Sequence, residues 1–269
     1  MMEHCEHSHD ILRQVAVVLS VLATLVSNAL AEALPINGQS TAAISDRFKV
    51  YFVPPGYVFS IWGLIYVGLV ALAIFQALPA QRENPRLREA SWWIALGGVA
   101  NSAWIVLWHY EQFALTVLVM LVLLASLIIA YLKLNAGHSD VGPGERWTVD
   151  LTISVYLGWI SVATIANISS VLKATGWNQF GLSAEVWMLV VLTLVLGIGL
   201  AMNLIRKDIA YAGVLIWALC GIAVKERATG SVAIPTWVVL GLVAVSLAVA
   251  LVRGKADGGG LPPKELSRL

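Results

Sequence analysis

Long apolar runs, each close to one membrane thickness in length, alternate with short polar breaks along the chain of 269 residues. A helix needs roughly 20 apolar residues to cross the hydrocarbon core of a bilayer. Eight runs reach or approach this length: residues 11–34, 57–78, 91–110, 113–134, 148–172, 186–205, 209–224 and 231–252. The pattern predicts an all-α fold, a polytopic membrane helical bundle of about eight transmembrane helices, of which the seventh is the shortest.

The composition indicates that lipid, rather than water, surrounds most of this chain. Hydrophobic residues make up 59% of the sequence, charged residues 12%, and the mean hydropathy is +0.80. Soluble domains carry about 25% charged residues, and a soluble chain this apolar would expose large hydrophobic patches. The lipid bilayer is therefore the expected partner. A net charge of +1 predicts no nucleic-acid partner, and two cysteines give no disulfide framework.

The lysine and arginine residues in the polar breaks predict the orientation of the helices. With the N-terminus in the cytoplasm, the inside segments hold 12 of these residues and the outside segments hold 5. Both termini are therefore expected in the cytoplasm, with loop 35–52 outside and loop 79–90 inside. The alternative is a signal peptide cleaved after residues 29–31. The chain begins with an acidic stretch, however, whereas signal peptides begin with a basic one.

The predicted spans lack the residue types on which most catalytic, metal-binding or proton-coupled sites depend. No acidic residue or histidine lies in mid-span, and no Ser-His-Asp, metal-ligand or phosphate-loop arrangement is recognisable. We therefore assign no catalytic residue and no metal ligand, and we expect no required cofactor. The N-terminal tail, HCEHSHD, has a composition that can bind Zn²⁺, but no second cluster completes a site.

Aromatic and amide side chains recur at helical spacing in three of the spans. They are Phe59, Trp62 and Tyr66 in the second span, Asn101, Trp104 and Trp108 in the third, and Tyr156, Trp159, Ala163 and Asn167 in the fifth. Spacings of three and four residues place each set on one helix face. An amide that faces lipid loses its hydrogen bonds, so Asn101 and Asn167 should point into the bundle.

We interpret these three stripes as the walls of an intramembrane cavity. Aromatic walls with a few polar groups are typical of small-molecule sites, and flat rings suit a flat, conjugated hydrophobic ligand. Two other interpretations stay open. Tryptophan also anchors helices at the membrane interface, which fits the tryptophans near span ends, and asparagine between helices can be purely structural.

Three motifs in these same spans resemble those of the TspO/MBR family, the tryptophan-rich sensory proteins that include the translocator protein, or peripheral benzodiazepine receptor. The segment VPPGYVFSIWGLIY is similar to the family's Pro-Pro-Gly-aromatic signature. ANSAWIVLWHY is similar to its third helix, and VYLGWISVATIAN to its fifth. The order and the intervals of the three motifs also fit the family.

The resemblance implies a five-helix membrane core with a ligand cavity that opens toward the loop between the first two helices. It implies porphyrins, haem-type compounds or other tetrapyrroles among the ligands. Trp62 and Trp159 match two pocket tryptophans that are linked in some bacterial members to the oxidative breakdown of porphyrin. Pro54, Pro55 and Gly56 match the hinge of a lid, where proline fixes the backbone angle and glycine is expected to give room for the turn.

The resemblance covers residues 11–172, which predicts four parts: an N-terminal tail (1–10), a TspO-like core (11–172), three additional helices (173–253) and a cytoplasmic tail (254–269). The additional helices would cover the lipid face of the core or replace a homodimer contact, so a homo-oligomer stays open. Gly197 and Ala201 should allow close packing among them.

Phe52 stands where the family has tryptophan, so the ligand is not fixed by the resemblance. Three functions follow from it: a receptor or sensor, a porphyrin-degrading enzyme, or an uncoupled transporter.

Overall fold

The computed structural model describes residues 2–34 and 36–258, and the side chains of residues 8–34 and 36–253. The described residues form helices and connecting loops without a strand. The side chains before Ser8, which include most of the possible metal ligands of the tail, lie outside this part of the chain.

Each of the eight predicted spans corresponds to a helix, so the all-α membrane bundle is confirmed. The long helices are α1 (Met2–Ala33), α3 (Ile61–Ala77), α4 (Pro85–His109), α5 (Phe113–Leu134), α7 (Leu151–Ala174), α8 (Ala184–Leu204), α9 (Ile209–Lys225) and α10 (Gly230–Gly258). In the described residues, seven apolar segments are long enough to cross a membrane, and α9, with 17 residues, is shorter. The connections contain α2 (Thr41–Asp46), α6 (Pro143–Glu145), the 3-10 turns η1 (Ile36–Gly38), η2 (Gly56–Ser60), η3 (Pro79–Gln81) and η5 (Gln179–Gly181), and the π-helical turn η4 (Arg146–Asp150).

Local capping explains where several of the helices begin and end. The Asn84 side chain accepts hydrogen bonds from the first turn of α4, and Pro85 occupies the first helical position. Ser183 caps α8 and Asp208 caps α9 in the same way. Asn135 ends α5 in the left-handed conformation that often terminates a helix. Polar residues at the breaks thus satisfy backbone groups that apolar neighbours could not.

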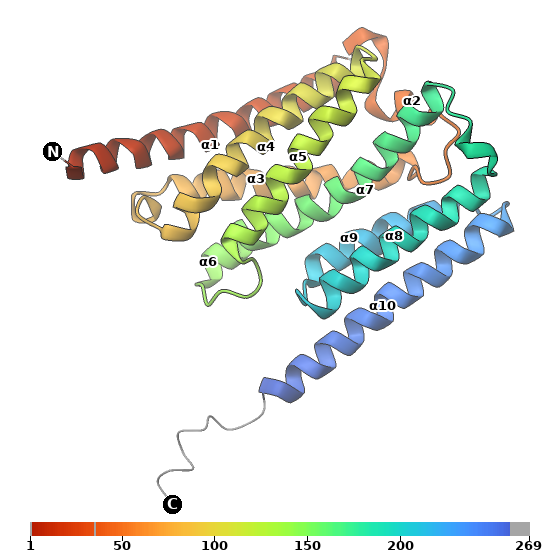
Figure 1. The fold of residues 1–269 in the computed structure, drawn as a ribbon. Helices are drawn as coiled ribbons and strands as arrows, with labels where there is room; N and C mark the ends of the chain where they lie inside the picture. The colour runs from red at the N-terminus through yellow and green to blue at the C-terminus, as the bar shows by residue number, and fades with distance from the viewer. Residues whose placement is uncertain (1, 35, 259–269) are drawn as a thin grey trace, which may run out of the picture.

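The helices form two groups that are joined through α7 and α9 (Figure 1). In the first group α4 packs against both α1 and α5, α5 packs against α7, and α3 packs against α1 and α7. Helices α4 and α5 form the antiparallel hairpin that their short connection predicts (Figure 1). In the second group α10 packs on α8 and α9, and α9 lies against α7.

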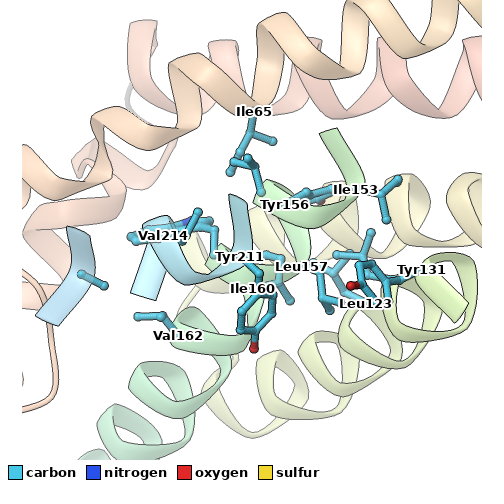
Figure 2. Packing of buried hydrophobic residues seen from close by; sticks show 14 of the residues in the cluster. Ile65, Leu123, Tyr131, Ile153, Tyr156, Leu157, Ile160, Val162, Tyr211 and Val214 are labelled. Atoms are coloured by element: carbon cyan, nitrogen blue, oxygen red, sulfur yellow. The ribbon is translucent and has the colours of Figure 1, made fainter. Parts of the chain in front are cut away.

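Helix α7 lies at the centre of the buried core. Figure 2 shows Tyr211 and Val214 of α9 beside Leu157 and Ile160 of α7, and all four side chains are buried. The backbone of α9 comes close to α7 at Gly158, where an added β-carbon would lie 3.1 Å from the β-carbon of Val214. The second group of helices is therefore packed against the core helix that carries the longest predicted stripe.

A buried carboxylate at the start of α9 ties this helix to the first group. Asp208 accepts hydrogen bonds from the Tyr131 hydroxyl of α5 at 2.8 Å and the Ser154 hydroxyl of α7 at 2.7 Å. It also accepts one from the backbone N–H of Tyr211 at 3.0 Å. A single side chain thus joins three helices while it caps one of them.

The close contact between α8 and α10 uses a different small residue from the ones predicted. Gly197 and Ala201 are exposed, and a β-carbon at Gly197 would have no neighbour within 4 Å. Gly199 faces α10 instead, where its β-carbon would lie 2.9 Å from Val243. The prediction chose the wrong face of α8 because both faces are apolar, and only the packing partner distinguishes them.

Candidate functional site

The predicted stripes of α3 and α7 meet in an aromatic cluster centred on Trp159. Trp62 stacks on Tyr66 with ring centroids 5.4 Å apart and meets the rings of Tyr156 and Trp159 edge-on at 6.0 and 6.4 Å. Phe59 contacts Trp159 edge-on at 5.5 Å. These distances fall within the range of favourable ring contacts, so the two stripes form one continuous wall.

The stripe of α4 faces the other side of Trp159 across a small cavity. Trp104 and Trp108 stack with centroids 5.5 Å apart and ring planes at 17°. The cavity between these rings and Trp159 has a volume of about 40 Å³. It is lined by Thr41, Ser45, Pro54, Phe59, Trp104, Trp108, Trp159, Val162, Ala163, Ala166, Asn167 and Ser170. We refer to this space as the aromatic cavity.

Six of the ten predicted site residues therefore line one space, and the other four lie behind it. The six are Phe59, Trp104, Trp108, Trp159, Ala163 and Asn167. Trp62, Tyr66 and Tyr156 form a second layer that reaches the cavity through Trp159. Asn101 is fully buried, and its side-chain oxygen accepts a hydrogen bond of 2.7 Å from Asn28 of α1.

Five polar atoms of these residues are buried without a hydrogen-bond partner in the described structure. They are Asn101 Nδ2, Trp104 Nε1, Tyr156 Oη, Trp159 Nε1 and Asn167 Oδ1. The Tyr156 hydroxyl lies beside the Asn101 amide, but the two make no hydrogen bond of good geometry. A buried polar group without a partner costs about 1–3 kcal/mol. Three of the five atoms, Trp104 Nε1, Trp159 Nε1 and Asn167 Oδ1, belong to residues that line the aromatic cavity.

The orientation of the Asn167 amide is fixed by a contact outside the cavity. Its Nδ2 donates to Thr116 Oγ1 on α5 at 3.1 Å, and Thr116 in turn donates to the Phe113 carbonyl at 2.6 Å. The amide nitrogen is thereby held toward α5, which leaves the unpartnered oxygen as an acceptor. The site therefore offers hydrogen-bond donors from indole N–H groups and an acceptor from Asn167.

Several lining residues were not predicted from the sequence. Thr41 and Ser45 come from α2, a helix of six residues capped by Ser40 in the loop after α1. Their spacing of four residues is the one sequence signal that could have placed them on a common face. Val162, Ala166 and Ser170 of α7 also line the cavity and neighbour the predicted Ala163–Asn167 face.

The segment 36–60 covers this cavity, and we refer to it as the lid. Its first half is held to the end of α4 by polar contacts. Buried His109 places Nε2 3.1 Å from the Thr41 hydroxyl and Nδ1 3.1 Å from the Ile36 carbonyl. Arg47 pairs with Glu111 in the α4–α5 turn at 2.9 Å, and both side chains are partly exposed to solvent.

The second half of the lid contains the predicted hinge, and α9 holds it. Pro55 is the extended residue before η2, as expected for proline, but Gly56 has an ordinary φ and open space around it, so the turn does not require glycine there. The close approach of the lid to α9 instead requires glycine at Gly221, since a β-carbon at this position would overlap Val58 and lie 3.3 Å from Pro55. The Trp217 indole also donates to the Val58 carbonyl at 3.1 Å.

A family model described as TSPO-like protein matches residues 14–251 of this chain. The chain belongs to this TSPO-like family. No curated protein and no solved structure matches it. The matched range extends through α8, α9 and α10, beyond the residues 11–172 over which the three sequence motifs resemble TspO/MBR proteins. The TSPO-like chain is an integral, multi-pass protein of the lipid bilayer, as its family and its apolar helices show.

Proposed function

We propose that this TSPO-like chain is a membrane receptor or sensor that binds a flat hydrophobic ligand, such as a porphyrin or another tetrapyrrole, in the aromatic cavity. The observation that carries the proposal is that three residues lining the aromatic cavity carry buried polar atoms without partners, Trp104 Nε1, Trp159 Nε1 and Asn167 Oδ1, among closely packed rings. Purely structural packing would favour partnered or apolar groups at such positions. A ligand with a conjugated ring and polar edge groups would contact the rings and pair with these three polar atoms.

The chemistry of the site suits recognition of a tetrapyrrole. Trp104 and Trp159 expose ring faces or edges to the cavity and carry indole N–H groups that can donate to ligand carboxylates. The Asn167 oxygen can accept a hydrogen bond from a pyrrole N–H. Offset or edge-on ring contacts would supply affinity, while the few polar contacts would fix the orientation of the ligand.

The size of the cavity requires the lid to move for such a ligand. Its volume is about 40 Å³, whereas sites for drug-sized ligands span roughly 300–1,000 Å³. Thr41, Ser45 and Pro54 of the lid form part of the wall, so displacement of the lid enlarges the space. In this proposal the structure corresponds to a closed form, and the ligand stabilises an open one by binding it more tightly.

Titration of the purified full-length protein with protoporphyrin IX, followed by the shift of the porphyrin absorption band, tests the proposal. Trp159→Ala should weaken binding by roughly 2- to 13-fold, since a ring contact contributes about 0.5–1.5 kcal/mol beyond its area. Trp62→Ala, which removes the ring behind Trp159, should weaken binding by a smaller factor. Trp237→Ala is the matched control because this half-exposed ring lies on α10. Trp104→Phe keeps a ring and removes one unpartnered N–H, so it separates hydrogen bonding from folding.

Equal affinities for the wild type, Trp159→Ala and Trp104→Phe would refute ligand binding in the aromatic cavity. Two further measurements separate the receptor from the other functions that the family resemblance implies. Porphyrin consumption in light or oxidant that disappears in Trp62→Phe would favour the enzyme. Porphyrin flux into proteoliposomes would favour the transporter, and saturable binding without either result supports the receptor.

A further inference from the structure

A second and larger hollow lies on the opposite side of α7, between this helix and α8. Its volume is about 320 Å³, and we refer to it as the lateral groove. Helix α7 turns Asn167 and Ser170 toward the aromatic cavity and Ile165 and Ile168 toward the groove. The two spaces are therefore distinct sites that share α7 as a wall and are covered by different residues of the lid.

The walls of the lateral groove are aliphatic along the length of the helices. Ile165 and Ile168 of α7 face Val191 and Leu194 of α8 across it. Leu194 lies ten residues beyond Ala184, the first residue of α8, so this wall extends about 15 Å from the helix end toward the bilayer interior at 1.5 Å per residue. Because Leu194 is 54% exposed, the groove is open to the surrounding lipid. Its shape and chemistry suit a single hydrocarbon chain.

The mouth of the lateral groove carries positive charge. Lys49 of the lid and Lys173 at the end of α7 both line the groove and are exposed. Among the described ion pairs, neither lysine is matched to a carboxylate. Two carboxylates lie close in sequence to the mouth. Glu185, next to Ala184, accepts a hydrogen bond from the Tyr51 hydroxyl at 2.9 Å, and the exposed Asp46, three residues before Lys49, is in none of the described ion pairs. The two ammonium groups are thus available for an anionic group above the apolar walls.

Two tryptophans mark the level of the membrane interface at this mouth. Trp177 and Trp187 also line the groove, and their ring centroids lie 4.9 Å apart. The Trp187 indole donates to the Gln179 carbonyl at 2.7 Å, which fixes its position. Tryptophan is enriched at the depth of lipid headgroups, so the lysines lie where a headgroup would be and the aliphatic walls lie where its chain would be.

We propose that the lateral groove binds an anionic phospholipid, with one acyl chain between α7 and α8 and the phosphate at Lys49 and Lys173. The lateral opening favours a molecule that is already in the bilayer. The paired lysines select an anionic headgroup over a zwitterionic one, because a basic side chain near a membrane surface favours anionic lipid by roughly fivefold. This site lies outside the aromatic cavity, although the lid contributes residues to both spaces.

Native mass spectrometry of the full-length protein, equilibrated with equal amounts of phosphatidylglycerol and phosphatidylcholine of the same acyl chains, tests the proposal. The wild type should retain phosphatidylglycerol in preference. Lys49→Gln combined with Lys173→Gln should reduce that preference by roughly 25-fold, or abolish it. Lys133→Gln combined with Lys207→Gln removes the same charge from exposed lysines elsewhere and should leave the preference unchanged. Ile168→Trp, which fills the groove without a change in charge, should lower the retention of phosphatidylglycerol.

Three results would overturn the proposal. The first is a wild type without any preference between the two lipids. The second is an equal loss of preference in both double variants, which would mean that overall charge, not this site, attracts the lipid. The third is retention of an added long-chain fatty acid in place of either phospholipid, which would assign the groove to a different amphiphile.

Discussion

Replacement of Asp208 by alanine should destabilise the protein far more than the loss of an ordinary helix cap. Asp208 caps α9 and also accepts hydrogen bonds from the Tyr131 and Ser154 hydroxyls on two other helices. Tyr131 is 2% exposed and Ser154 is 4% exposed, so neither hydroxyl regains a full set of water contacts when the carboxylate is removed. The substitution therefore removes one cap and leaves two buried donors without their acceptor.

The size of the effect follows from these three contacts. Loss of a side-chain cap costs about 1 kcal/mol. Each buried hydroxyl left without a partner costs about 1–2 kcal/mol, the lower part of the range for buried polar groups, because a hydroxyl can rotate toward another acceptor, such as a backbone carbonyl of its own helix. The free energy of unfolding should therefore fall by about 3–5 kcal/mol in Asp208→Ala. Ser183→Ala is the matched control, because the exposed Ser183 caps α8 through one backbone N–H. It should cost about 1 kcal/mol.

Unfolding of both variants in mixed micelles by a denaturing detergent, followed by circular dichroism, measures the difference. The expected gap between Asp208→Ala and Ser183→Ala is about 2–4 kcal/mol, the contribution of the two cross-helix contacts. Asp208→Asn, which keeps one acceptor oxygen, should fall between them. Equal losses in the two alanine variants would show that Asp208 acts only as a cap and that α9 is attached to the core by packing alone.

Two further predictions concern the lid and the orientation of the chain. The Arg47 guanidinium holds the pKa of Glu111 below its usual 4.5, so the contribution of this pair to lid closure is present above about pH 4.5 and is lost as the pH falls through the lowered pKa. In stopped-flow mixing, Glu111→Gln should bind porphyrin faster than the wild type at pH 7, and the two rates should converge in acid; a constant ratio at all pH values would contradict the role of the pair. The orientation can be tested with single cysteines in a background without other cysteines. Asp46→Cys should react with an impermeant thiol reagent in intact cells, and Glu83→Cys should not. Both positions are exposed, and the charge pattern places them on opposite sides of the membrane. The reverse labelling would overturn the predicted cytoplasmic termini.

The helices of this protein could be predicted closely because lipid imposes a simple rule on length and polarity. The run 113–134 coincides with α5, and the break before it coincides with the α4–α5 turn. The site was predictable to the extent that it depends on spacing within a helix. The three stripes converge as predicted from this spacing. Trp104 and Trp159 line the aromatic cavity, and Trp62 lies directly behind Trp159.

Other parts of the site depend on contacts that have no periodic signal. Thr41 and Ser45 lie in a helix of six residues, too short and too polar for a hydrophobic pattern, and the contacts with α4 place it. The choice between Gly197 and Gly199 depends on the rotation of α8, which an apolar sequence does not define when lipid covers the other face. The lateral groove likewise arises from the spacing of α7 and α8, which lie in different packing groups.

The attachment of the lid to α9 has a consequence for the route by which a ligand of the proposed kind would arrive. The second half of the lid packs closely on Gly221 of α9 and accepts two hydrogen bonds from this helix, one from Trp217 and one from Lys225 to the Val53 carbonyl at 2.9 Å. The first half is held by the polar contacts of His109 and Glu111, which water can replace during opening. The lid would then open first at α2, which would move away from the α4–α5 turn. The passage for the ligand would form beside that turn. The C-terminal helices would set the direction of access, although they lie outside the aromatic cavity.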